Sequence, residues 1–167
     1  MAKEFSLKVL SSSAQRTKKA GKDLGKLLPP GAVVALEGDL GSGKTLFVKG
    51  LAEGLKIEKP GEVRSPTFAL IQEHQGPIPL CHADLYRLGA PEIRNLGLEE
   101  YWRRSWVTAI EWADRAAGLL PGGPGLESPL SVRFQILSPN KREIVFAGNS
   151  DWEKILRKWE RIFLEKS

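Results

Sequence analysis

The chain has few of the residues that build disulfide frameworks and zinc sites. Its 167 residues include one cysteine, Cys81, and two histidines. A lone cysteine excludes an internal disulfide framework and is typical of a reducing compartment. So few cysteines and histidines also exclude a structural zinc site. We expect Cys81 to be a small buried apolar residue and not a nucleophile.

Long apolar runs are missing as well. No stretch approaches the roughly 20 residues that a helix needs to cross a bilayer. The first residues, Met1 to Phe5, contain no apolar core of a secretory signal. These absences predict a cytoplasmic protein that does not act in a membrane. With 41% hydrophobic and 27% charged residues, the chain is expected to fold as one domain, residues 1–167, with a substantial core.

The basic residues are not accompanied by aromatic ones, although the net charge is +5. Such a balance allows contact with RNA or an acidic partner. A platform for stacking nucleic-acid bases would need aromatic side chains among the basic residues, so solvated lysines on helix faces are the preferred interpretation. The basic residues form two loose groups: Arg16, Lys18, Lys19, Lys22 and Lys26, and Arg94, Arg103, Arg104 and Arg115.

The stretch Gly38–Thr45 matches G-x-x-x-x-G-K-[ST], the pattern of the phosphate-binding P-loop. The apolar run Ala32–Leu36 predicts a buried strand before it, and apolar residues at helical spacing predict a helix after it. Glycines let the backbone wrap around phosphate oxygens, and amides at the helix start face the anion. In this motif Lys44 reaches the β- and γ-phosphates and the Thr45 hydroxyl ligates Mg²⁺. The chain is therefore predicted to bind a nucleotide.

Apolar periodicity and turn residues divide the rest of the chain into short elements. Further strands are expected at 5–10, 67–71, 79–83, 106–110, 130–136 and 143–146, and the last two read as a hairpin around Pro139-Asn140. Helices are expected at about 14–28, in short pieces within 91–102, and at 151–165, where an apolar face would pack on the chain's own domain. This alternation predicts an α/β fold: a P-loop NTPase-like, three-layer architecture with a mixed central sheet and a C-terminal β-hairpin and helix.

Two acids stand at the ends of expected strands. Glu111 follows the strand at 106–110, and Asp84 follows the apolar residues at 80–83. Ligands of open α/β sheets bind at the carboxyl ends of the strands, and a P-loop enzyme needs an acid for its metal or its water shell. Either acid could order Mg²⁺ or the attacking water. A helix cap or a surface ion pair is the alternative for each.

Polar residues near these acids have two interpretations each. In Ser65-Pro66-Thr67 a hydroxyl could sense the γ-phosphate, as switch segments do, or cap a turn. His82 is expected to be a packed residue or a partner of a site residue, not a catalytic base. Arg87 could neutralise phosphate charge or pair with a neighbouring acid.

The absence of a complete guanine-reading motif is used to predict the base of the nucleotide. Asn140–Glu143 approaches the guanine-reading pattern N-K-x-D but ends in glutamate and lies in an expected hairpin turn. The sequence therefore favours ATP over GTP. A nucleotide-dependent switch protein and a small-molecule kinase remain alternatives, although no arginine-rich lid of the kind that such kinases carry stands out.

Five segments in this order resemble a known family. They are Gly38–Thr45, Ser65–Phe68, His82–Leu88, Leu96–Tyr101 and Ile110–Trp112. Together they resemble the bacterial ATPase family of tRNA threonylcarbamoyladenosine biosynthesis (the TsaE, or YjeE, family) over nearly the whole chain. The resemblance implies a cytoplasmic P-loop ATPase that is required for the threonylcarbamoyl modification (t6A) of adenosine 37 in tRNAs reading codons that begin with A.

The resemblance also implies roles for residues of this sequence. ATP and Mg²⁺ are the implied cofactors, with Thr45 and Glu111 as metal ligands. Lys44, Asp84 and Thr67 fall on positions associated with nucleotide turnover. Thr17 matches a position near the adenine, and Arg142 a basic position of the C-terminal hairpin. The implied nucleotide-binding residues are Gly38, Asp39, Leu40, Gly41, Ser42, Gly43, Lys44, Thr45, Leu46, Trp112, Thr17 and Arg142.

The partners that the family implies are a threonylcarbamoyl transferase subunit and its inactive paralogue (TsaD and TsaB type). Contact with tRNA is expected to be indirect or weak, and neither a membrane nor DNA is expected as a partner. No arginine finger or activating glutamine is recognisable, and such a finger is worth about 10³ to 10⁵ in rate. We therefore expect slow ATP hydrolysis by the isolated protein and completion of the site by its partners.

Overall fold

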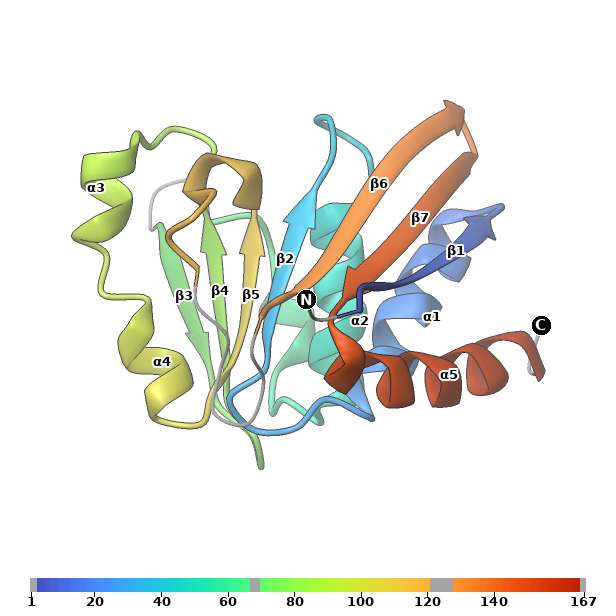
Figure 1. Cartoon of the computed structure of the whole chain (residues 1–167), viewed down its shortest axis with the longest axis horizontal. Helices are drawn as coiled ribbons and strands as arrows, with labels where there is room; N and C mark the ends of the chain where they lie inside the picture. The colour runs from blue at the N-terminus through green and yellow to red at the C-terminus, as the bar shows by residue number, and fades with distance from the viewer. Residues whose placement is uncertain (1–2, 67–69, 121–127, 166–167) are drawn as a thin grey trace.

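A seven-stranded sheet forms the centre of the molecule (Figure 1). The computed structural model describes residues 3–66, 70–120 and 128–165. The strand order is β1-β7-β6-β2-β5-β4-β3. The strands are β1 (Phe5–Ser11), β2 (Val33–Glu37), β3 (Ile71–His74), β4 (Leu80–Asp84), β5 (Val107–Glu111), β6 (Leu130–Ser138) and β7 (Lys141–Gly148).

The sheet is mixed, as the sequence predicts. β2 pairs in parallel with β5 and β6, and β4 pairs in parallel with β5. The outer strands β3, β7 and β1 run antiparallel to their neighbours. Because β2, β4, β5 and β6 point the same way, their carboxyl ends meet at one edge, the upper edge in Figure 1. In such sheets that edge is where ligands bind.

Helices cover both faces of the sheet, which confirms the predicted three layers. One core joins β2, β5, β6 and β7 to α1, α2 and α5; a second joins β2, β4 and β5 to the segment that carries α3, α4 and η2. Figure 1 shows α1 and α2 behind the sheet. The helices are α1 (Ala14–Gly25), α2 (Lys44–Gly54), α3 (Ala90–Arg94), α4 (Glu99–Arg103) and α5 (Ser150–Glu165), with the 3-10 turns η1 (Pro60–Glu62) and η2 (Ala113–Ala116).

Glycines allow α1 and α2 to lie unusually close. A Cβ at Gly21 would overlap the carbonyl of Phe47, and a Cβ at Gly50 would overlap the carbonyl of Lys18. Gly25 and Gly54 face each other one turn further along. This contact places the start of α1 beside the start of α2, at the ligand-binding edge of the sheet.

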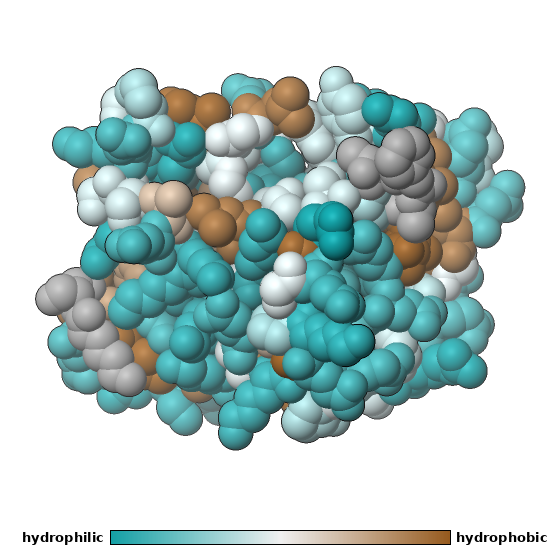
Figure 2. Space-filling model, turned by 180° about the vertical axis from the view of Figure 1, so that it is seen from behind, coloured by the Kyte–Doolittle hydropathy of each residue, from teal (hydrophilic) through white to brown (hydrophobic). Residues whose placement is uncertain are grey.

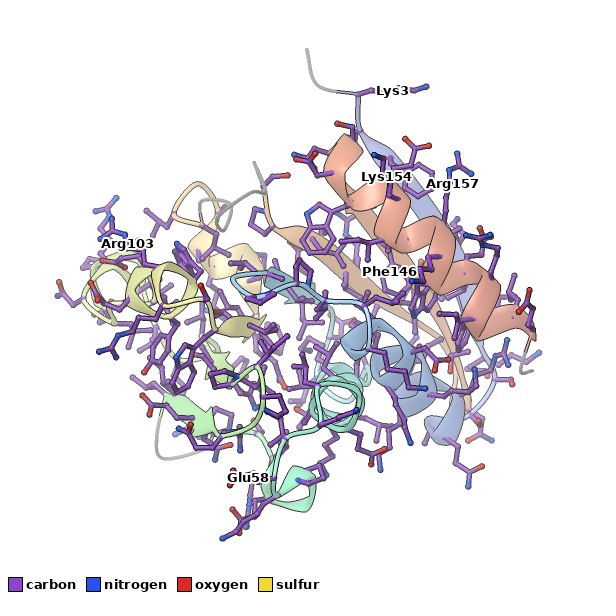
Figure 3. The ribbon with its side chains drawn as sticks, turned by 90° about the horizontal axis from the view of Figure 1, so that it is seen from below. Lys3, Glu58, Arg103, Phe146, Lys154 and Arg157 are labelled. Atoms are coloured by element: carbon purple, nitrogen blue, oxygen red, sulfur yellow. The ribbon has the colours of Figure 1, made fainter. Side chains whose placement is uncertain are left out.

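The C-terminal helix packs on its own domain, as expected. Its buried side chains are Trp152, Leu156, Trp159 and Phe163. The Trp159 ring lies 4.5 Å from that of Phe146 on β7, and its indole N–H donates to the carbonyl of Ala20 on α1. Figure 3 shows Phe146 between α5 and α1, whereas Lys154 and Arg157 point outward.

Most predicted boundaries lie within one or two residues of those in the structure, and two predicted elements differ by more. The strand expected at 67–71 begins at Ile71 and runs to His74; residues 67–69 lie outside the described part, and Leu70 is in a bend. The strand was predicted at 67–71 because these residues form an apolar run. The real edge strand carries polar residues because one of its faces meets solvent. The helix expected to reach Leu28 ends at Gly25, since Pro29 disfavours helical conformation in the residue before it.

None of the described helices is long and apolar enough to cross a membrane. Cys81 is fully buried, as predicted, and burial raises the pKa of its thiol. Seen from behind, hydrophilic residues cover most of the lower half of the molecule, and apolar residues remain in patches (Figure 2).

Candidate functional site

A cavity of about 600 Å³ opens at the carboxyl edge of the sheet. It lies between the start of α1, the loop from β2 to α2, the ends of β4 and β5, and the turn between β6 and β7. Its walls bring together most of the residues singled out in the sequence: Thr17, Leu40, Gly41, Ser42, Gly43, Lys44, Thr45, Leu46, Asp84, Glu111, Trp112 and Arg142. Gly38 and Asp39 do not line the cavity, but their carbonyls accept from Lys44 Nζ, and Thr67 lies outside the described residues.

The loop Gly38–Thr45 has the strand–loop–helix context that the sequence predicts. Gly43 precedes α2 with φ +108°, a backbone conformation that residues other than glycine rarely adopt. A Cβ at Gly38 would lie 2.7 Å from Ser42 Oγ. Within the described residues, no hydrogen bond takes up the N–H groups of Gly43, Lys44 and Thr45. These amides stand at the start of α2, where the helix dipole favours an anion.

Lys44 is buried inside this loop. Its side chain is 4% exposed, and Nζ donates to the carbonyls of Gly38 and Asp39 over 2.6 and 2.9 Å. The ammonium also lies 4.2 Å from the centre of the Trp112 ring. Burial lowers the pKa of Lys44, while the charges of Glu111, Asp84 and Asp39 oppose that shift. A cation is thus held at the floor of a cavity lined by helix-start amides.

Thr45 and Glu111 both line the cavity, and their side chains are hydrogen-bonded to each other. The Thr45 hydroxyl donates to Glu111 Oε1 over 2.8 Å. His82 Nε2 lies 3.0 Å from the same oxygen, and His82 is fully buried. His82 is therefore packed against a site residue, in agreement with the prediction. Glu111 is the last residue of β5 and not the first after it.

These residues fit a magnesium ion that is shared with phosphate. Among the described residues, no three His, Cys, Asp or Glu side chains gather as a metal-ligand group. A hydroxyl and one carboxylate are nevertheless suited to Mg²⁺, which proteins bind through one or two carboxylates together with substrate phosphates and water. The Thr45–Glu111 pair beside the loop amides meets that description.

Asp84 is held firmly at the end of β4. Its Oδ2 accepts from the Ser65 hydroxyl over 2.9 Å, and its Oδ1 accepts from the backbone N–H of Tyr86 over the same distance. Asp84 is the Cα partner of Glu111 in the parallel pair β4 and β5. The two acids therefore stand side by side at the carboxyl ends of neighbouring strands. Of the segment Ser65-Pro66-Thr67, the described residues show Ser65 holding Asp84.

An aromatic wall closes the cavity beside the acids. Trp112 follows Glu111 with φ +58°, and its ring lies 4.8 Å from that of Tyr86. The Arg115 guanidinium lies 5.5 Å from the Tyr86 ring. The sequence identified Trp112 through the family resemblance only; the partnership with Tyr86 carries no sequence signal because it depends on the fold. Arg87 lines the cavity, and no ion pair is found for it among the described residues.

The opposite wall comes from α1 and the C-terminal hairpin. Thr17 is buried and its hydroxyl lies 2.7 Å from that of Ser11. The hairpin contributes Pro139, Asn140 and Arg142. Asn140 is in the turn between β6 and β7, as expected.

The basic residues of α1 are largely neutralised. Lys19 and Lys26 pair with the buried Asp23, and Lys18 and Lys22 pair with Glu53. Arg16 lies over the ring of Phe163. These contacts agree with the interpretation of a solvated helix face.

Comparison with known proteins gives one consistent result. A family model described as "Threonylcarbamoyl adenosine biosynthesis protein TsaE" matches residues 11–144. A relative from Treponema pallidum, named tRNA threonylcarbamoyladenosine biosynthesis protein TsaE, is 40% identical over 142 residues, which cover 84% of this chain and all of the relative. A relative of the same name from Bacillus subtilis is 40% identical over 143 residues, with 85% of each chain covered. The crystal structure of Bacillus subtilis YdiB superposes with a TM-score of 0.75 at 33% identity, covering 96% of this chain and 97% of the other.

Proposed function

Since this chain belongs to the TsaE family and shares its role in tRNA threonylcarbamoyladenosine biosynthesis, we propose that it serves that process as a magnesium-dependent ATPase. The modification is that of adenosine 37 in tRNAs reading codons that begin with A, and the place of action is the cytoplasm. The contact that carries this proposal is the bond between the Thr45 hydroxyl and Glu111 Oε1, beside the buried Lys44 and the oriented Asp84.

Phosphate binding falls to the loop and Lys44. The N–H groups at the start of α2 donate to phosphate oxygens, and the Lys44 ammonium neutralises their charge. To do so, Nζ exchanges its bonds with the carbonyls of Gly38 and Asp39 for bonds with phosphate. Each bond from the ammonium to a neutral carbonyl is replaced by a bond to a charged phosphate oxygen, so that both donor and acceptor are ionised.

The metal would be held by Thr45 Oγ1 and Glu111. When bound there, Mg²⁺ neutralises the charge that develops on the phosphate oxygens. His82 keeps the Glu111 carboxylate facing Thr45 because it contacts the oxygen that accepts the threonine hydroxyl.

Asp84 is the residue proposed to orient the attacking water. Its two carboxylate oxygens already accept from Ser65 and from the Tyr86 amide, so the side chain is fixed before substrate binds. A carboxylate has further acceptor positions on each oxygen, and one of them can accept a hydrogen bond from a water in the cavity. Thr67 is the second residue proposed for turnover, on the grounds of the family resemblance.

A slow basal rate is part of the proposal. The Arg142 guanidinium donates to backbone carbonyls, and no hydrogen bond or ion pair among the described residues fixes Arg87. Neither arginine is held as a finger toward a transferred phosphate. We therefore propose that the threonylcarbamoyl transferase subunit and its inactive paralogue complete the site, with tRNA reached through them.

The test is phosphate release from ATP by the purified chain, alone and with the transferase pair from the same organism. A low rate alone and a clear rise with the pair support the proposal, and Lys44→Ala should abolish the rise. A fast rate of the isolated chain, or no rise with a properly assembled pair, would contradict it. Transfer of phosphate to a metabolite instead of water would favour a small-molecule kinase.

A further inference from the structure

We propose that Arg142 is a positioning residue that holds the phosphate-binding loop in its binding conformation from the tip of the C-terminal hairpin. This inference rests on the proposed function, because it concerns how the loop is made ready for a nucleotide. The resemblance to the family suggested only that a basic residue here lies close to the nucleotide. The structure shows what its guanidinium contacts.

Arg142 bridges two segments about one hundred residues apart. Its Nε donates to the carbonyl of Ser42 over 3.1 Å, and its Nη2 donates to the carbonyl of Gly41 over 3.1 Å. Its Nη1 contacts the carbonyls of Ser138, Pro139 and Lys141 at 2.8, 3.2 and 3.1 Å. Five backbone oxygens thus surround one guanidinium, two from the loop and three from the hairpin tip.

The bond to Ser42 decides where an amide points. In a planar trans peptide the C=O of one residue and the N–H of the next point in opposite directions. Because the Ser42 carbonyl is drawn toward Arg142, the N–H of Gly43 is turned away from it. No group within the described residues accepts from that N–H, and Gly43 lines the cavity. Arg142 thereby aims a free donor at the place of the phosphates without touching them.

The loop needs such an anchor because its glycines leave it flexible. Gly41 and Gly43 adopt φ +76° and +108°, and glycine loses more conformational freedom on ordering than any other residue. A loop that is already ordered in the free protein does not have to be ordered by the ligand, so affinity rises. The same anchor fixes Pro139 and Asn140 in the opposite wall of the cavity.

Only arginine can make this contact. A guanidinium presents five N–H donors in a rigid planar fork, whereas a lysine ammonium is a point charge on a flexible stem. Lysine at position 142 would keep the charge but could not reach Gly41, Ser42 and the hairpin carbonyls together. The substitution Arg142→Lys therefore separates the effect of the positive charge from that of the guanidinium geometry.

The experiment compares Arg142→Lys and Arg142→Gln with the unchanged chain. Two quantities are measured: the affinity for ADP, and the hydrogen–deuterium exchange of peptides covering residues 38–45 without nucleotide. Arg157→Lys is the matched control, since this arginine also makes a forked contact, to Glu153, on the outer side of α5 (Figure 3). Thermal melting of each variant checks the fold.

Both Arg142 variants should bind ADP about tenfold or more weakly, the factor that corresponds to losing one charge-assisted hydrogen bond. Both should exchange the loop amides faster in the free protein. The control should match the unchanged chain.

Full ADP affinity and unchanged exchange in Arg142→Lys would overturn the proposal, because charge alone would then suffice. Weaker ADP binding with unchanged loop exchange would also overturn it, since Arg142 would then act on the nucleotide directly. If Arg142→Gln fails to fold, Arg142→Lys decides. If the unchanged chain binds no ADP, the proposed function fails. The hydrogen–deuterium exchange of residues 38–45 then decides alone whether Arg142 holds the loop.

Discussion

The hydroxyl of Thr45 and the carboxylate of Glu111 meet at 2.8 Å, although 66 positions separate them in the chain. Thr45 is in the first turn of α2, and Glu111 ends β5, the parallel neighbour of β2. The glycine loop that links β2 to α2 is what places the hydroxyl opposite the strand end. The hydroxyl and the carboxylate proposed to hold Mg²⁺ are thereby placed together by the fold.

Glu111→Gln should remove the charge of this pair while keeping its shape. An amide oxygen can still accept from Thr45, so the fold should be retained. We expect partner-stimulated phosphate release to fall by about 100-fold or more, the scale of losing a preorganised electrostatic group, and Mg²⁺ should no longer strengthen ADP binding. Glu143→Gln, which removes only an ion pair with Lys8, is the control. Undiminished turnover in a folded Glu111→Gln protein would take Glu111 out of the site.

Ser65→Ala tests whether Asp84 must be held in one orientation. The change removes the donor to Asp84 Oδ2 and leaves the bond from Tyr86 N–H to Oδ1. We expect phosphate release to fall about tenfold, the equivalent of one hydrogen bond in the transition state. ADP affinity should stay constant, and Ser65→Thr should restore the rate. An equal loss of ADP affinity would show instead that Ser65 shapes the binding cavity.

The sequence predicts well those parts of the site that follow from local pattern. The phosphate-binding loop can be predicted from Gly38–Thr45 alone, because these eight residues contain both the glycines of the loop and the start of the following helix. Glu111 and Asp84 were each expected at the carboxyl end of a strand because each follows an apolar run. Asp84 is the last residue of β4 and Glu111 the last of β5, and the register that makes them partners is a finding of the structure.

What the sequence does not predict depends on contacts between distant segments. Arg142 meets the loop at Gly41 and Ser42 only because β7 and β6 bring the hairpin tip to the same edge as β2. Ser65 meets Asp84 across 19 positions, a span that includes β3 and β4. The edge strand Ile71–His74 was misplaced because three of its four residues are polar, and periodicity identifies only strands with an apolar face.

Gly50→Ala should destabilise the protein although alanine is the better helix former. In an exposed helix this change would add up to about 1 kcal/mol of stability. Here the new Cβ would overlap the backbone of Lys18 in α1, and forcing packed elements apart costs about 1 to 3 kcal/mol. The check is the denaturation midpoint. Gly61→Ala, where a Cβ would meet nothing within 4 Å, should leave the midpoint unchanged, and a stabilised Gly50→Ala would refute the close helix contact.

His74 should make the protein less stable in mild acid. Burial lowers the pKa of its imidazole, the neighbouring His82 lowers it further, and Glu62 opposes both. The unfolded chain then takes up a proton below about pH 6.5 that the folded chain resists.

The contribution of His74 to stability is therefore complete above that pH and is lost as the pH falls, by at most about 1.4 kcal/mol per pH unit. Nε2 of His74 has no hydrogen-bond partner within the described residues, so His74→Leu sacrifices no bond of that atom. The free energy of unfolding of His74→Leu, minus that of the unchanged chain, should increase between pH 7 and pH 5, because all other titrating groups are common to both. A difference that stays constant over this range would mean that His74 is protonated as readily in the fold as in the unfolded chain.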